Sequence, residues 1–131
     1  MKRLAAILCA TGILLEMGFS GEARADAREI YHCRYAPGAG YQDLLEAYVL
    51  YRGLMDSNGF EDYRVELWFP LYDGETKPGT FIWQGTSPSM ARLGAANDWF
   101  WFSDDAAPSR EAFEKSSICA SASMFYTEKL D

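Results

Sequence analysis

Alternation of apolar and polar side chains predicts the strands of this chain. Residues 63–69 (YRVELWF) place apolar or aromatic side chains at every odd position, and residues 118–126 (ICASASMFY) alternate in the same way. A period of two is typical of a strand with one buried face. Residues 30–35, which precede the Pro- and Gly-rich turn 36–40, and residues 80–84 are predicted as two further strands.

Spacings of three and four residues predict the helices. Residues 41–56 carry apolar side chains at this spacing, and the sequence Ser57-Asn58-Gly59 ends the pattern. A second helix is expected to begin with Ser87 as its cap and Pro88 at its first position, and to run past Asn97. A third, short helix is expected over residues 108–115.

The order of these elements is strand, helix, strand, strand, helix, strand, with the short third helix before the last strand. This is the α+β order of the ferredoxin-like βαββαβ sandwich, a four-stranded antiparallel sheet with helices on one face. In that fold the last strand lies antiparallel to the first. Pairing residue 33 with residue 119 then places Arg28 opposite Met124 and Ile30 opposite Ala122.

Residues 1–25 have the pattern of a secretory signal peptide. Lys2 and Arg3 precede an apolar run from Leu4 to Leu15, and the sequence ARA at 23–25 fits the small-x-small cleavage rule. A run of this length rises about 18 Å as a helix, too short for about 30 Å of hydrocarbon. We expect residues 26–131 to form one domain in the periplasm or outside the cell. The alternative is a leader retained as an anchor.

Charge and cysteine content narrow the partners and the compartment. The formal net charge of −7 argues against nucleic acid and against anionic membranes as partners. Cys33 and Cys119 are the two cysteines that follow the leader, and an even pair in an exported domain predicts a disulfide. The facing strands would bring them within reach, although two buried free thiols remain the alternative.

The segments FIWQGTSPS (residues 81–89) and GAANDW (residues 94–99), on this strand and helix order, resemble the dimeric α+β barrel superfamily. The resemblance is closest to short exported bacterial members, and the group includes antibiotic-biosynthesis monooxygenase-like and NIPSNAP-like proteins. It implies a homodimer. A haem-degrading member would bring Asn, Trp and His together, whereas His32 here lies on the first strand. No cofactor is therefore expected.

Several polar residues are candidates for a binding site, each beside a structural alternative. His32, the only histidine, lacks neighbours at metal-ligand spacing, so no metal site is expected and a sheet histidine is the alternative. Arg64 shares a strand face with Glu66, and Gln84 is placed on the same sheet face. These side chains would line a polar pocket or form an ion pair within a dimer interface. No catalytic residue is predicted.

The stretch NDWFWFSDD, residues 97–105, contains four consecutive aromatic residues. A helical turn cannot turn all four inward, so two should pack under the sheet and two should be partly exposed. We expect Trp99 to face the sheet with its indole N–H bonded, and Phe100 to be partly exposed. The acidic pair 104–105 is expected to cap the following helix, with a cation site as the alternative.

Two functions are compatible with the sequence. The first is binding of a small hydrophobic ligand in an aromatic-lined pocket, or a non-catalytic dimeric module. The second is a cofactor-free monooxygenase or isomerase of the α+β barrel type, with Trp83, Asn97, Trp99 and His32 around the substrate. A pocket of about 300 Å³ or more with convergent polar groups would support a ligand site, and a filled interior would exclude both.

Overall fold

The computed structural model describes residues 26–70 and 79–127. The predicted leader, and most of the connector between the second and third strands, lie outside the described residues. The strands are β1 (Asp26–Tyr35), β2 (Arg64–Trp68), β3 (Thr80–Ser87) and β4 (Ser117–Thr127). The helices are α1 (Tyr41–Ser57), α2 (Met90–Phe102) and α3 (Ala107–Ser116), with a 3-10 turn (Asp104–Ala106) between α2 and α3.

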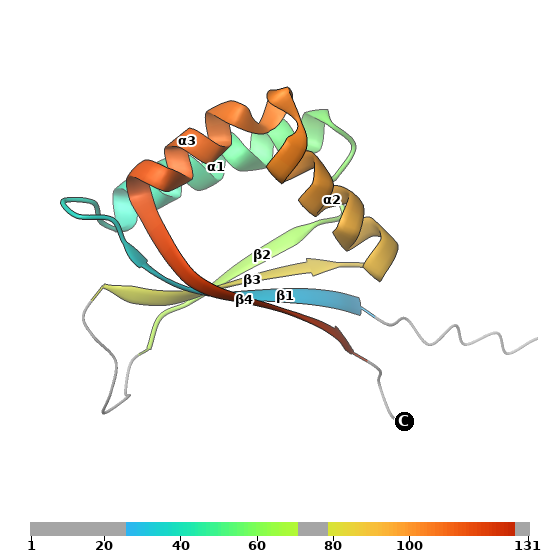
Figure 1. Ribbon diagram of the computed structural model, residues 1–131, viewed down its shortest axis with the longest axis horizontal. Helices are drawn as coiled ribbons and strands as arrows, with labels where there is room; N and C mark the ends of the chain where they lie inside the picture. Colours follow the sequence, from blue (N-terminus) through green and yellow to red (C-terminus); the bar gives the residue numbers. More distant parts are fainter. Residues whose placement is uncertain (1–25, 71–78, 128–131) are drawn as a thin grey trace, which may run out of the picture.

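The described strands form one antiparallel sheet in the order β2-β3-β1-β4, and the helices lie together on one face of it (Figure 1). This is the ferredoxin-like βαββαβ arrangement, so the predicted fold class is confirmed. Because successive side chains of a strand alternate between faces, each strand has an inner face toward the helices and an outer face away from them.

Aromatic side chains dominate the core between the sheet and the helices. The ring of Tyr51 in α1 lies at its centre, with neighbouring ring centroids 5.5–6.4 Å away. Its partners come from strands and helices alike: Tyr63, Trp83, Trp99, Phe100 and Phe113. All of these pairs except Tyr51–Trp99 meet edge to face, and such pairs stabilise beyond the area they bury, by about 0.5–1.5 kcal/mol each.

The pairing of β1 with β4 confirms one part of the prediction and corrects another. Cys33 lies opposite Cys119, and the two form a disulfide. The register then shifts by one residue between His32 and Cys33, so Arg28 pairs with Phe125 instead of Met124. Ile30 likewise pairs with Ser123 instead of Ala122. A bulge adds a residue to one strand, and the alternating pattern of β4 does not reveal it.

The start of α2 also differs from the prediction. The cap is Ser89, whose side chain accepts a hydrogen bond from the backbone N–H of Arg92, and the helix begins at Met90. Ser87 instead ends β3, where it is buried and pairs with Ala27. Strand pairing thus outweighed the local helix-start signal of Ser87 and Pro88.

Candidate functional site

A cavity of about 270 Å³ lies between the inner face of the sheet and helices α2 and α3. Its walls are mainly aromatic rings, contributed by Tyr31, Tyr51, Tyr63, Phe81, Trp83, Phe100, Trp101 and Phe113. Three of the lining side chains, Trp101, Glu114 and Cys119, are exposed, and they mark where the cavity meets solvent. The volume is close to the lower limit of about 300 Å³ for small-molecule sites.

A buried carboxylate, Glu29 of β1, lines this cavity. Only 4% of the residue is exposed. Its Oε2 accepts hydrogen bonds from the Tyr31 hydroxyl at 3.0 Å and from the Asn97 amide at 2.8 Å. Its Oε1 accepts a short hydrogen bond from the Tyr63 hydroxyl. Burying a carboxylate is costly unless it is hydrogen-bonded, and these donors offset that cost.

The hydroxyl groups that face Glu29 are held in their donor form. Burial, reinforced by the neighbouring carboxylate, raises the pKa of Tyr31 well above its ordinary value. Burial likewise raises the pKa of Tyr63, with further contributions from Tyr51 and Glu29. Both hydroxyls therefore stay protonated at neutral pH and donate hydrogen bonds to the carboxylate.

Gly85 of β3 makes room for this arrangement. A Cβ atom at position 85 would lie 2.0 Å from the Tyr63 hydroxyl oxygen and 2.8 Å from Glu29 Oε1. No side chain other than hydrogen fits there without displacing one of these groups. The glycine thus allows the tyrosine ring to cross the sheet surface and reach the carboxylate.

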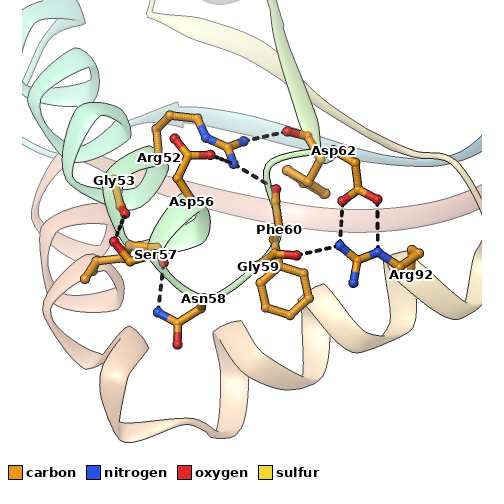
Figure 2. A network of polar contacts seen from close by, with 11 residues as sticks. Arg52, Gly53, Asp56, Ser57, Asn58, Gly59, Phe60, Asp62 and Arg92 are labelled. Atoms are coloured by element: carbon orange, nitrogen blue, oxygen red, sulfur yellow. Dashed lines mark hydrogen bonds and ion pairs between the residues drawn. The ribbon is translucent and has the colours of Figure 1, made fainter.

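A second polar network, drawn in Figure 2, fixes the connection that carries Tyr63 into β2. Arg52 of α1 donates hydrogen bonds to the carbonyls of Tyr63 and Phe60, and also contacts Asp56. From α2, Arg92 contacts both carboxylate oxygens of Asp62. We name residues 52, 56, 60, 62 and 92 the arginine corner. Its contacts hold the backbone from which the Tyr63 side chain enters the core.

Two of the predicted ligand-binding residues meet at the cavity. Trp83 contributes a wall, and its indole N–H lies 3.5 Å from the Tyr63 hydroxyl oxygen. Asn97 lines the cavity and donates to Glu29. Trp99 does not line it: its ring packs against Phe60.

The other three predicted residues lie on the outer face of the sheet. His32 and Arg64 are exposed there. Gln84 is on the same face, as expected, but is buried, and its amide donates to Glu66 at 3.4 Å. The structure therefore separates these three from the cavity, because alternation along β1 and β3 directs them away from the helices.

As expected, two of the four consecutive aromatic residues pack inward and two are exposed, but the predicted hydrogen bond of Trp99 is not found. Trp99 and Phe100 are partly buried and pack against the core, whereas Trp101 and Phe102 are exposed. The expectation that the Trp99 indole is bonded was wrong: its buried N–H has no partner among the described residues. Phe100, partly exposed as predicted, also packs against Tyr51 and lines the cavity.

Glu29, the acid at the centre of the site, was not among the residues predicted from the sequence. Glu29 precedes the strand predicted from residue 30, but β1 begins at Asp26, which places Glu29 on the inner face beside Tyr31. The available signal was the alternation of Ala27, Glu29, Tyr31 and Cys33. A single charged residue in such a series is a marker of a functional position or of a paired core group.

The described residues contain neither a metal-binding cluster nor a membrane-spanning helix. No group of three or more His, Cys, Asp or Glu side chains there could hold a metal ion. Within the same residues, no helix has the length and apolar character needed to cross a membrane.

Comparison with known proteins supports the fold. No protein-family model matches the sequence, and no curated protein does. Among solved structures, a hydroxynitrile lyase from Passiflora edulis is 16% identical with a TM-score of 0.51, over 82% of this chain and 96% of that one. A hypothetical protein from Arabidopsis thaliana is 11% identical with a TM-score of 0.50, over 84% and 91%.

A dimeric ferredoxin-like protein of unknown function from Thermobifida fusca is 11% identical with a TM-score of 0.49, over 80% and 92%. Identities this low establish the fold alone. The first two structures thus confirm the ferredoxin-like fold that the resemblance implied.

Proposed function

We propose that this protein is an exported binding domain that holds a small, mostly apolar molecule in the cavity between its sheet and helices. The observation that carries the proposal is a cavity of about 270 Å³ with aromatic walls and one buried carboxylate. Small-molecule sites combine mostly apolar walls with a few polar groups that fix orientation. Here Glu29, with its tyrosine and asparagine donors, supplies those groups.

The leader and the disulfide support export. Residues 1–25 carry the signal-peptide pattern, and the Cys33–Cys119 bridge suits an oxidising compartment. We propose that residues 26–131 are the mature, single domain. N-terminal sequencing of exported protein should find Asp26 first, and a retained Met1 would contradict this.

We also propose that two copies associate through the outer faces of their sheets. Trp68 and Phe125 lie on this face, because they pair with Ile82 and Arg28, whose side chains point away from the helices. Both aromatic side chains are exposed. Exposed aromatic residues on a sheet face are typical of an interaction surface. Sedimentation should show a dimer that Trp68→Glu shifts toward monomer, and a monomeric parent protein would exclude this arrangement.

The binding proposal can be tested with a neutral probe and a blocked cavity. Ala96 of α2 is buried and lines the cavity, whereas the adjacent Ala95 is exposed. Ala96→Phe should fill the cavity and abolish binding of benzyl alcohol, measured by tryptophan fluorescence, and Ala95→Phe should leave it unchanged. Circular dichroism checks that both variants fold. Absence of binding to the parent protein would refute a ligand site.

A second candidate function is proton transfer of the isomerase type. It is favoured by the position of Glu29, a buried carboxylate that lines an apolar cavity, where it could act as a general base. The Passiflora edulis hydroxynitrile lyase shows that this fold can support an enzyme. Exchange of a carbon-bound deuterium of a bound ketone into water, lost in Glu29→Gln, would support this candidate.

A further inference from the structure

Among the described residues, the contacts of Glu29 lack positive charge. Its hydrogen-bond partners, the hydroxyls of Tyr31 and Tyr63 and the amide of Asn97, are all neutral. The ion pairs among the described residues join Arg52 to Asp56 and Arg92 to Asp62, so neither involves this carboxylate. A buried carboxylate is normally paired with a cation or bound to a metal.

Arg110 is the one cationic side chain among the described residues that line the cavity, and its hydrogen bonds go to groups other than Glu29. Arg110 of α3 donates from its Nη1 to the carbonyls of Phe100 and Ser103, at 2.5 Å and 2.9 Å. Those carbonyls belong to the last turn and the C-cap of α2, where unpaired carbonyl groups favour a positive charge. Arg110 therefore binds the end of α2, and none of the described residues supplies a cation to Glu29.

Glu29 also has an acceptor position to spare. A carboxylate offers about four lone-pair positions on its two oxygens. Oε2 uses two, for Tyr31 and Asn97, while Oε1 uses one, for Tyr63. No further donor to Glu29 is found among the described residues, so one position on Oε1 remains for a donor that enters the cavity.

The walls suit a cation as well as an apolar body. The faces of Trp and Tyr rings attract a cation within about 6 Å, and the attraction increases where water is excluded. Trp83, Tyr51 and Phe113 all line the cavity, and the pairs among them meet edge to face, 5.2–5.7 Å apart. A ligand with a positive group would thus meet both a carboxylate and aromatic faces.

The size of the cavity limits the body of the ligand. A dry protein cavity of about 150 Å³ is large enough to hold benzene. The cavity here, about 270 Å³, therefore has room for one aromatic ring with a short substituent.

From these observations we propose that the cavity selects a small aromatic or aliphatic amine, whose ammonium group donates a hydrogen bond to Glu29 Oε1 and supplies the missing positive charge. This inference rests on the proposed binding function and specifies its ligand class. Recognition requires no covalent step.

Three probes of similar size test the inference: benzylamine, benzyl alcohol and benzoate, titrated calorimetrically into the mature protein at neutral pH. Because charge-assisted hydrogen bonds are about twice as strong as neutral ones, benzylamine should bind at least about tenfold more tightly than benzyl alcohol. Benzoate should bind most weakly. Equal affinities, or a preference for benzoate, would overturn the inference while leaving the binding function intact; no binding of any probe would refute both.

Two isosteric variants identify the carboxylate that is responsible. Glu29→Gln should abolish the preference for benzylamine and change the affinity for benzyl alcohol by less than about threefold. Glu114→Gln, at the other acid of the cavity lining, should leave the preference unchanged. If instead Glu114→Gln abolishes the preference, the amine binds at the opening and the inference is wrong.

A readout in the parent protein keeps the test valid if Glu29→Gln does not fold. The Asn97 side-chain amide donates to Glu29, so its NMR signals report on that carboxylate. Benzylamine should shift these signals, with saturation at the calorimetric affinity. Binding of the amine without any change at Asn97 would place it elsewhere and overturn the assignment.

Discussion

Two polar networks of this protein place their acids in opposite settings. In the arginine corner, at the surface, Asp56 and Asp62 contact Arg52 and Arg92 at 2.5 Å and 2.7 Å (Figure 2). In the core network, the carboxylate of Glu29 contacts two tyrosine hydroxyls and an asparagine amide, and no cation from the part of the chain that the structure describes.

The difference indicates which network has unsatisfied charge and is therefore suited to bind a ligand. Exposed ion pairs are complete in themselves, and each contributes little because water screens it. A buried acid without a cation is incomplete, and the low dielectric around it strengthens any charge that enters. The core network is therefore the one that we propose as the recognition element, and the corner contributes only local support to the backbone around Tyr63.

The largest expected effect comes from breaking the core network through Gly85. In Gly85→Ala, the new Cβ would meet the Tyr63 hydroxyl at 2.0 Å, so the ring and the carboxylate must both move. We expect a loss of more than about 3 kcal/mol in unfolding free energy, measured by denaturant titration, because overpacking and a lost buried bond add.

Gly94→Ala is the matched control for this prediction. Gly94 lies within α2, and a Cβ there has nothing within 4 Å. Alanine is a better helix former, so this variant should be more stable by about 0.5–1 kcal/mol. If both variants were equally tolerated, the close contact of Gly85 with the core network would be wrong.

Trp99 joins the two regions, and its removal should have the next largest effect. Its ring lies 5.7 Å from Phe60 in the arginine corner and 6.4 Å from Tyr51 beside the cavity. Trp99→Ala should cost about 2–4 kcal/mol by thermal or chemical unfolding, somewhat less than a fully buried tryptophan.

Trp101→Ala provides the contrast. Trp101 is exposed and lines the cavity, so its removal should cost less than about 1 kcal/mol and should weaken probe binding. A stability loss at Trp101 as large as that at Trp99 would show that the division of the aromatic stretch is misassigned.

Removal of one hydroxyl from the core network gives a smaller effect. Tyr63→Phe leaves Oε1 of Glu29 without its donor, so we expect a loss of about 1–3 kcal/mol. The exposed Tyr41 serves as the control, and Tyr41→Phe should be neutral. A neutral Tyr63→Phe would mean that the hydrogen bond does not stabilise the folded protein.

The strands could be predicted because alternation is a local property, but the site depends on contacts between distant residues. Glu29 meets Tyr63 and Asn97, which lie 34 and 68 positions away in the chain. No local pattern links these residues. The bulge that shifts β4 is likewise invisible in a strand whose two faces have similar composition. Trp83 and Asn97 were found only through their residue type and the fold resemblance.

The smallest expected effect lies in the arginine corner. The hydrogen bond from Arg92 lowers the pKa of Asp62 below its ordinary value of 3.8. Because the folded pKa is the lower one, the pair stabilises fully above pH 3.8, and its contribution is lost as the pH falls through the folded pKa. Asp62→Asn should therefore destabilise less at pH 7 than the changes at Gly85, Trp99 and Tyr63, and not at all in acid.

Asp98→Asn, at an exposed acid of α2, is the control for this pH profile. As the pH falls from 7 to 2, the unfolding midpoint of Asp62→Asn should approach that of the parent protein. The difference in midpoint between Asp98→Asn and the parent protein should show no such decrease. A difference that persists in acid would contradict the ionic origin of the Asp62 contribution.

The most direct test of the central claim is a crystal structure of the mature protein with benzylamine. We expect the ring inside the cavity, against the walls formed by Trp83 and Phe113, and the nitrogen within about 3 Å of Glu29 Oε1, the distance of a charge-assisted hydrogen bond. An amine that binds outside the cavity, or a cavity closed by its own side chains, would contradict the account.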